Sequence, residues 1–266
     1  MYGKILRMKR LVDPSRRMCV VPMDHGITLG PIKGLENYSN TIDQVAANGA
    51  DAIILHKGLL LKVIEHQKTN VPHCRYILHL SASTSLSPDV HSKTLVSSVE
   101  EALMLGVDGV SMHVNLGCAD EKIMIGDLGR ISGECQKWGM PLLAMMYVSS
   151  NDENNSDKII HAARIAEELG ADIIKIDCLH PVNKLEKLMQ GVHTPVLIAG
   201  GPKTNEVESL LQMIASALEM GVAGAAIGRN IFQHARYGIL TLLISRMIHG
   251  ELSLPDAVYE LKRINE

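Results

Sequence analysis

The sequence predicts an α/β protein that folds as one (β/α)8 TIM barrel over residues 1–266, with a helical extension at its C-terminal end. Short runs rich in apolar residues alternate with longer segments in which apolar residues recur every three or four positions. There are eight such runs, about 20 to 35 residues apart, which is typical of a closed parallel barrel surrounded by helices. An open, doubly wound sheet is the alternative, but it usually has fewer strands and often a glycine-rich turn after the first one.

The predicted strands share an apolar body that ends at a glycine, a proline or an ionisable residue. In chain order they are MCVVPMDH (18–25), DAIILHKG (51–58), CRYILHLS (74–81), DGVSMHVN (108–115), PLLAMMY (141–147), DIIKIDC (172–178), PVLIAGG (195–201) and AGAAIGR (223–229). Between them, helical spacing with a glycine near the end marks segments such as TIDQVAANGA (41–50), VSSVEEALMLG (96–106), HAARIAEELG (161–170) and SLLQMIASALEMG (209–221).

Three of these helices lead into a strand through a glycine followed, two residues later, by an aspartate: Asp51, Asp108 and Asp172. We interpret the glycine as the helix C-cap and place the aspartates on the stability face of the barrel, opposite the catalytic face. The polar stretch VSSNDENNSD (148–157) is expected to be a mobile loop near that catalytic face. Residues 230–266 are expected to cover the barrel or to meet another subunit.

Composition excludes several classes of function. The formal net charge is −3, the basic residues are scattered, and there are only one Trp and one Phe, so a nucleic-acid interface is not expected. No apolar run reaches the roughly 18 residues of a membrane span, and the first residues lack the apolar core of a signal peptide, which favours a cytoplasmic protein. Five cysteines without a C-x-x-C pair indicate reduced, buried thiols.

The sixth predicted strand contains the most unusual residue for a core. Lys175 lies among Ile173, Ile174 and Ile176, and burial disfavours an ammonium ion, so a partly neutral, nucleophilic amine is expected there. A salt-bridged lysine is the alternative, because Asp177 lies two residues on and therefore on the same face of the strand.

Two other strand ends supply groups that move protons. The fifth strand ends in Tyr147, and the first ends in Asp24 next to His25. A lysine that forms a Schiff base needs such partners while the carbinolamine loses water and the enamine gains or loses a proton. Together the three residues Lys175, Tyr147 and Asp24 predict Schiff-base catalysis at the mouth of the barrel.

Glycine-rich turns after the seventh and eighth strands predict an anion site. AGGPKTN (199–205) and GRNIFQ (228–233) each place bare backbone at a strand end, followed by the start of a helix, and Arg229 adds a charged donor. Phosphate sites recur at this place in barrels of this kind, so a phosphorylated small carbonyl compound is the expected substrate. Tight structural turns are the alternative interpretation of these glycines.

The chain resembles the DhnA-type class I aldolases, a family that includes archaeal fructose-bisphosphate aldolase. The blocks that carry the resemblance cover nearly the whole chain and are VPMDHGITLGPIKGL, LHKG, SVEEALMLGVDGVSMHVNLG, WGMPLLAMMY, HAARIAEELGADIIKI, AGGPKTN and GAAIGRNIFQ. The resemblance implies that Lys175 is the Schiff-base lysine, Tyr147 the proton donor and Asp24 the acid/base partner. It also implies substrate contacts at His25, Gly26, Ile27, Thr28, Val148, Ser149, Gly200, Gly201, Gly228 and Arg229, no cofactor, and a homo-oligomer built from rings, such as a decamer.

Two segments depart from the family pattern. Val148, Ser149 and Ser150 follow Tyr147 where the pattern has Pro-Arg-Gly, and Asp177 lies in a segment after the lysine that also differs. We expect Asp177 either to pair with the α-ammonium of an amino-aldehyde substrate or to tether His180 or a neighbouring loop.

The expected reaction is a Schiff-base transaldolase or aldolase reaction that transfers a three-carbon unit from a phosphorylated ketose to L-aspartate semialdehyde. Joining dihydroxyacetone phosphate to the same aldehyde, and cleavage of fructose 1,6-bisphosphate, are close alternatives. Metal-dependent aldol chemistry is an alternative of another class, because His25, His56, His79 and His113 fall at or near the ends of the first four strands. A third alternative is a non-catalytic phosphosugar-binding protein, which would need the glycine-rich turns but not Lys175, Tyr147 and Asp24 together.

Overall fold

The chain forms the closed parallel barrel that the sequence predicts. The structure is a computed structural model that describes residues 2–12, 15, 17–66, 74–149, 155–204 and 206–265. The barrel strands are β1 (Met18–Pro22), β2 (Ala52–Leu55), β3 (Arg75–His79), β6 (Gly109–Leu116), β7 (Leu142–Val148), β8 (Ile173–Ile176), β9 (Val196–Ala199) and β10 (Gly224–Ala226). Because β1 pairs with both β2 and β10, the barrel closes and the open-sheet alternative is excluded.

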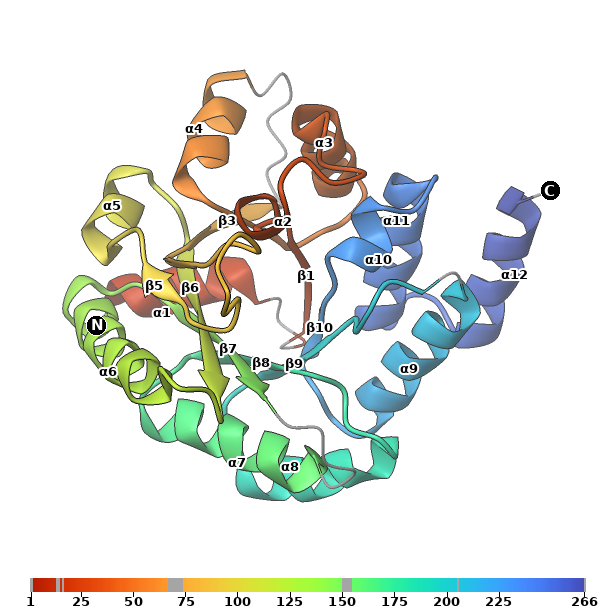
Figure 1. The fold of residues 1–266 in the computed structure, drawn as a ribbon. Helices are drawn as coiled ribbons and strands as arrows, with labels where there is room; N and C mark the ends of the chain where they lie inside the picture. Colours follow the sequence, from red (N-terminus) through yellow and green to blue (C-terminus); the bar gives the residue numbers. More distant parts are fainter. Residues whose placement is uncertain are drawn as a thin grey trace.

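Helices surround the strands on the outside (Figure 1). The longer ones are α3 (Tyr38–Ala47), α4 (Lys57–His66), α6 (Glu121–Trp138), α7 (Asn155–Glu168), α9 (Val207–Glu219) and α11 (Tyr237–Ile248), with the shorter α5 (Val99–Met104), η1 (Val182–Lys184) and α8 (Leu185–Gly191) between them. The C-terminal extension covers the barrel, because α11 packs against α3 and β1. This confirms the first of the two expectations for residues 230–266. The last helix, α12 (Leu254–Asn265), packs against α9 and α11.

Alternation along each strand separates two apolar layers. On β8, Ile174 and Ile176 pack between the barrel and its helices, whereas Ile173 packs inside the barrel against residues such as Met145 of β7. Lys175 lies between the two outward-facing isoleucines and therefore points inward. Lys175 therefore points into the barrel from a strand that is otherwise apolar.

The aspartates before the strands have the structural role that the sequence predicts. Gly49, Gly106 and Gly170 all adopt positive φ angles, as C-cap glycines do. Asp51 accepts a hydrogen bond from the backbone N–H of Cys19 at 2.6 Å, and Asp172 accepts one from Leu142 at 2.9 Å. Each aspartate therefore ties the start of its strand to a neighbouring strand.

Two elements were not predicted. The first is α1 (Tyr2–Leu11), whose Leu11 packs inside the barrel core and whose Lys4 and Arg10 form ion pairs of 2.8 Å with Asp172 and Asp108. This helix therefore closes the N-terminal end of the barrel. The second is the antiparallel hairpin of β4 (Ser81–Ala82) and β5 (Thr94–Leu95), inserted after β3.

Three further expectations can be compared with the structure. All five cysteines are free, and four of them are buried, as expected for reduced core thiols. Residues 150–154 of the polar stretch 148–157 lie outside the described residues, while Val148 ends β7 and Asn155 begins α7. Within the described part of the chain, no helix combines the length and the apolar character that a membrane span needs.

Candidate active site

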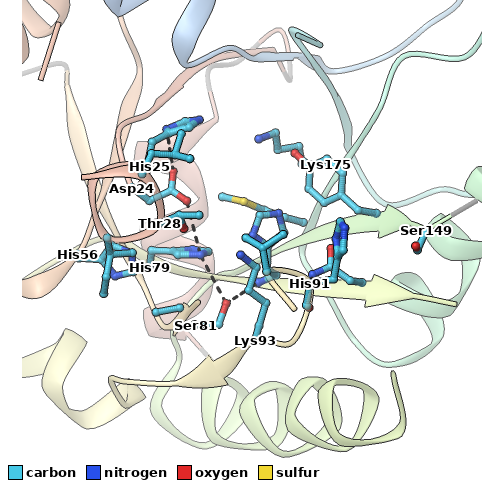
Figure 2. Close-up of a pocket in the computed structure, with 18 of the residues that line it drawn as sticks. Asp24, His25, Thr28, His56, His79, Ser81, His91, Lys93, Ser149 and Lys175 are labelled. Atoms are coloured by element: carbon cyan, nitrogen blue, oxygen red, sulfur yellow. Dashed lines mark hydrogen bonds and ion pairs between the residues drawn. The ribbon is translucent and has the colours of Figure 1, made fainter. Parts of the chain in front are cut away.

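The carboxyl ends of the barrel strands surround a cavity of about 640 Å³. Asp24, His25 and His79 lie on one side of it, and Lys175 lies across from them (Figure 2). Tyr147 and Asp177 also line the cavity. The three residues that the sequence selected for Schiff-base chemistry are therefore brought into one site from β1, β7 and β8.

Lys175 is only 7% exposed, and its Nζ lies 5.7 Å from the centre of the Tyr147 ring. Burial by itself lowers the pKa of Lys175. The phenol of Tyr147 and the carboxylates of Asp24 and Asp177 raise it, and the resulting pKa lies above the ordinary value. The expectation of a partly neutral amine was therefore wrong for the resting site, because anionic neighbours outweigh desolvation.

Asp24 is ionised although it is buried. Burial raises its pKa, but the imidazoles of His79 and His25 and the ammonium of Lys175 lower it to well below the ordinary value. Its two carboxylate oxygens lie 3.7 Å from His25 Nδ1 and 3.6 Å from His79 Nε2. Asp24 therefore contributes a negative charge to the cavity.

A row of aromatic rings crosses the site: His56, His79, His113 and Tyr147, with successive ring centres 5.2, 5.8 and 4.7 Å apart. The ring of His79 is oriented by a hydrogen bond of 2.8 Å between its Nδ1 and the hydroxyl of Ser111. Burial lowers the pKa of His79 to about 3 and also lowers those of His56 and His113, so these rings are neutral near pH 7.

A smaller cavity of about 260 Å³ adjoins the first one and contains the predicted anion site. Gly200, Gly201, Gly228 and Arg229 all line it. Asn230 fixes the turn after β9, because its Nδ2 donates hydrogen bonds to the carbonyls of Gly200 at 2.7 Å and Pro202 at 3.0 Å. The two glycine-rich turns therefore meet at one place, as the sequence predicts.

The local geometry of these turns differs from the prediction in one respect. A helix follows the eighth strand at once, since α10 (Arg229–Phe232) begins directly after Gly228, but α9 begins only at Val207. The helix dipole at the cradle therefore comes only from the short α10. Gly228 itself is required by space, because a Cβ there would lie 2.6 Å from the carbonyl oxygen of Pro22 and 2.7 Å from the His25 ring.

Most of the predicted substrate-contact residues line one of the two cavities. His25, Ile27, Thr28, Val148, Ser149, Asp177 and Arg229 line the larger one, and Gly200, Gly201 and Gly228 line the smaller one. Gly26 lines neither cavity; it begins the short helix α2 (Gly26–Leu29), which carries Ile27 and Thr28.

Sequence reasoning missed part of the larger cavity's wall. Ser81, His91 and Lys93 come from the β4–β5 hairpin, and Asn115 comes from the inner face of β6. The hairpin gave no strand signal because its strands have two residues each. Asn115 had a signal, since it ends the predicted fourth strand two residues after His113.

The group of Asp24, His79 and His113 also bears on the metal-dependent alternative. One ligand atom from each residue lies within 4.8 Å of the others, close enough for all three to approach one ion. The other two histidines of that alternative, His25 and His56, are not part of this group.

The fold and the mouth of the barrel define the class of protein: a (β/α)8-barrel enzyme with its ionisable side chains at the carboxyl ends of the strands. A family model described as DeoC/LacD family aldolase matches residues 18–234. The chain belongs to this aldolase family.

Two relatives of similar sequence are named as synthases. The chain is 39% identical to the 2-amino-3,7-dideoxy-D-threo-hept-6-ulosonate synthase of Halobacterium salinarum, over 96% of this chain and 94% of the relative. It is 38% identical to the 2-amino-4,5-dihydroxy-6-oxo-7-(phosphonooxy)heptanoate synthase of Streptomyces griseus, over 94% and 91% of the two chains.

Among solved structures, it is similar to an archaeal fructose 1,6-bisphosphate aldolase, with a TM-score of 0.81 and 27% identity over 93% of this chain and 99% of the other. Another archaeal fructose-1,6-bisphosphate aldolase structure, in which the catalytic lysine is covalently bound to the carbinolamine intermediate, matches with a TM-score of 0.79 and 27% identity over 93% and 100% of the two chains.

Proposed function

We propose that this aldolase is a Schiff-base transaldolase that moves a three-carbon unit from a phosphorylated ketose to L-aspartate semialdehyde, forming 2-amino-3,7-dideoxy-D-threo-hept-6-ulosonate. The observation that carries the proposal is the buried Lys175 beside Tyr147 and across the cavity from Asp24. The similarity to a synthase of this name over nearly the whole chain supports the choice of reaction.

The chemistry begins with proton removal, because the resting Lys175 is charged. The neutral amine attacks the ketone carbon of the donor, and the carbinolamine then loses water to give the protonated imine. Electrons of the breaking C–C bond flow into the protonated imine, which leaves an enamine on Lys175, and the rest of the donor leaves as an aldehyde that keeps the phosphate, because the product carries none. Asp24 accepts the proton that the hydroxyl of this leaving fragment gives up, and Tyr147 donates a proton to the new hydroxyl as the enamine adds to the acceptor aldehyde. Water then releases the product from the new imine.

The remaining residues hold the substrates. We assign the phosphate of the donor to the cradle of Gly200, Gly201, Gly228 and Arg229. Asp177 is assigned to the α-ammonium of the acceptor, since it lines both cavities. The alternative, a tether to His180, has no support: among the described residues, no hydrogen bond or ion pair joins the Asp177 carboxylate to a side chain or backbone group.

The proposal is tested by borohydride reduction of the enzyme mixed with each candidate ketose phosphate, followed by mass spectrometry of the protein and its peptides. We expect one covalent adduct, located on Lys175. Lys175→Ala should abolish both the adduct and turnover while circular dichroism stays unchanged, because removing a buried charge relieves desolvation. Lys187→Ala, on the surface, is the matched control. Undiminished trapping in Lys175→Ala would disprove the assignment.

The same donors, offered with L-aspartate semialdehyde, separate the related reactions. Consumption of dihydroxyacetone phosphate would indicate the condensation that the name of the Streptomyces relative describes. Cleavage of fructose 1,6-bisphosphate without an acceptor would indicate a simple aldolase. As part of the same proposal we expect a ring-based homo-oligomer in the cytoplasm, acting in biosynthesis of aromatic amino acids; light scattering measures the assembly.

A metal-dependent aldolase is the second candidate, and the group of Asp24, His79 and His113 is the observation in its favour. A bound divalent cation would stabilise an enolate in place of the imine. Loss of activity in EDTA together with no borohydride adduct would support this candidate over the first.

A further inference from the structure

The smaller cavity contains two opposite charges that have no partner in the described part of the chain. Arg229 and Asp177 both line it, together with the glycine-rich turns at Gly200, Gly201 and Gly228. Among the described residues, none forms a hydrogen bond or ion pair with the guanidinium of Arg229 or the carboxylate of Asp177, and these two groups are not paired with each other. Burial raises the pKa of Asp177, and the ammonium of Lys175 only partly offsets this. A ligand with charges of both signs would supply the missing partners.

The donors at the positive side of this cavity suit a carboxylate as well as a phosphate. The planar guanidinium of Arg229 matches the paired oxygens of either group. Within the described chain, the backbone N–H groups of Gly201 and Gly228 donate no hydrogen bond, so they are free to bind an anion. The cradle that we assign to the phosphate of the donor can therefore also bind a carboxylate.

The proposed reaction brings two aldehydes to the same place in turn. The aldehyde carbon of the leaving fragment has just separated from the enamine carbon, and the aldehyde carbon of the acceptor forms its new bond to that same enamine carbon. In aspartate semialdehyde the carboxylate carbon is three bonds from the aldehyde carbon. In a three-carbon aldehyde phosphate the phosphorus is four bonds from it. The two anionic groups therefore reach nearly the same distance from the enamine on Lys175.

We propose that the cradle of Gly200, Gly201, Gly228 and Arg229 binds two anions in turn: the phosphate of the leaving aldehyde and then the α-carboxylate of the acceptor. This inference rests on the proposed transaldolase function and specifies how its acceptor is recognised. The α-carboxylate and the α-ammonium are attached to one carbon, so their partners must lie in one small cavity, as Arg229 and Asp177 do. The acceptor is then held by both of its charges while its aldehyde points toward Lys175.

The test uses hydroxyacetone as the donor, because its three carbons are those that the product receives and no phosphate then enters the reaction. In Arg229→Gln we expect kcat/KM for L-aspartate semialdehyde and for succinic semialdehyde to fall about tenfold or more, as for loss of a charged hydrogen bond. With 3-aminopropanal, which keeps the amine and lacks the carboxylate, the change should stay within about twofold. Arg130→Gln on the surface of α6 is the matched control and should leave all three values unchanged.

Asp177→Asn should show the opposite selectivity. We expect a loss of about tenfold with L-aspartate semialdehyde and with 3-aminopropanal, and little change with succinic semialdehyde, which has no amine. Inorganic phosphate gives a further measurement on the unmodified enzyme. With hydroxyacetone as the donor, phosphate should raise KM for L-aspartate semialdehyde without lowering kcat, and Arg229→Gln should weaken this competition.

Other outcomes would overturn the inference. An equal loss with all three acceptors in Arg229→Gln would mean that Arg229 only supports the turns. Inhibition by phosphate that lowers kcat and leaves KM unchanged would mean that the carboxylate binds elsewhere. Borohydride trapping with hydroxyacetone separates the two proposals. Trapping on Lys175 together with unselective losses would reject only the shared cradle, whereas failure of the unmodified enzyme to be trapped would reject the Schiff-base function itself.

Discussion

The charge on Lys175 is set by its neighbours rather than by its burial. The phenol of Tyr147 and the carboxylates of Asp24 and Asp177 keep the pKa of Lys175 above the ordinary value. A buried ion pair of this kind costs desolvation energy, and its presence at a strand end is typical of a functional site. In the mechanism that we propose, proton transfer away from Lys175 must therefore precede attack on the ketone.

In the mechanism that we propose, Tyr147, whose ring centre lies 5.7 Å from Lys175 Nζ, is the proton donor. In Tyr147→Phe the imine should still form, but turnover should fall about 100-fold, the usual scale for loss of a general acid. The ring keeps its packing against His113, so the melting temperature should change little. Borohydride trapping and steady-state rates on the same sample check both expectations, and a mutant that also loses trapping would place Tyr147 earlier in the reaction.

At the scale of single elements, the barrel closes where β10 meets β1. Gly224 of β10 lies opposite Met18 of β1 and has a φ angle of +137°. A Cβ at this position would lie 2.1 Å from the carbonyl oxygen of Met18, far inside van der Waals contact. The glycine therefore allows the backbones of two paired strands to approach each other, which a side chain would prevent.

Gly224→Ala should lower the free energy of unfolding by at least about 3 kcal/mol, because the clash and the φ angle both oppose the side chain. The matched control is Gly126→Ala in the middle of α6, where an added Cβ meets nothing within 4 Å. That change should stabilise the chain by about 0.5–1 kcal/mol through helix propensity. Urea unfolding curves measure both, and equal effects would contradict the closure argument.

The inserted hairpin shows how an element can add a site without changing the barrel. β4 and β5 pair only with each other, outside the sheet that closes the barrel. Hydrogen bonds from α2 and β6 nevertheless place His91 and Lys93 on the cavity wall. A short insertion after one strand therefore adds side chains to the cavity wall, while the strand ends keep Lys175, Tyr147 and Asp24.

For the whole molecule, the buried histidines predict sensitivity to acid. The pKa of His79 is about 3 in the folded chain against an ordinary value of 6.5. As the pH falls through 6.5, the unfolded chain binds a proton there and the folded chain does not, so the free energy of unfolding decreases over that window. The pKa of Asp24 is lowered, so it acts in the same direction, because stability from such a carboxylate is also lost as the pH falls.

Urea unfolding at pH 7.5 and pH 5 tests this expectation. The contribution of His79 alone between pH 7.5 and 5 is about 2 kcal/mol, and the other buried histidines add to it. His79→Gln should reduce the difference between the two pH values, whereas His161→Gln on the exposed side of α7 should leave it unchanged. A difference that His79→Gln does not alter would contradict this account.

The sequence by itself determined the barrel and brought Lys175, Tyr147 and Asp24 to one end of it. Eight apolar runs at regular spacing predict the strands, because alternation and helix periodicity are local properties. The same alternation places Lys175 on the inner face of β8, and the end of a strand is where Tyr147 and Asp24 stand out. The meeting of the glycine turns was predictable as well, since the carboxyl ends of two neighbouring parallel strands lie at the same edge of the sheet.

Only the tertiary structure decided the ionisation of the site and which residues of the inserted hairpin line the cavity. The pKa of Lys175 depends on Asp24 and Tyr147, which lie on other strands, so no local pattern could give its direction. Lys93 lines the cavity on a hairpin that Thr28 and Asn115 hold through hydrogen bonds from α2 and β6. Contacts between residues distant in the chain set local dielectric and charge, and these quantities are defined only once the barrel has closed.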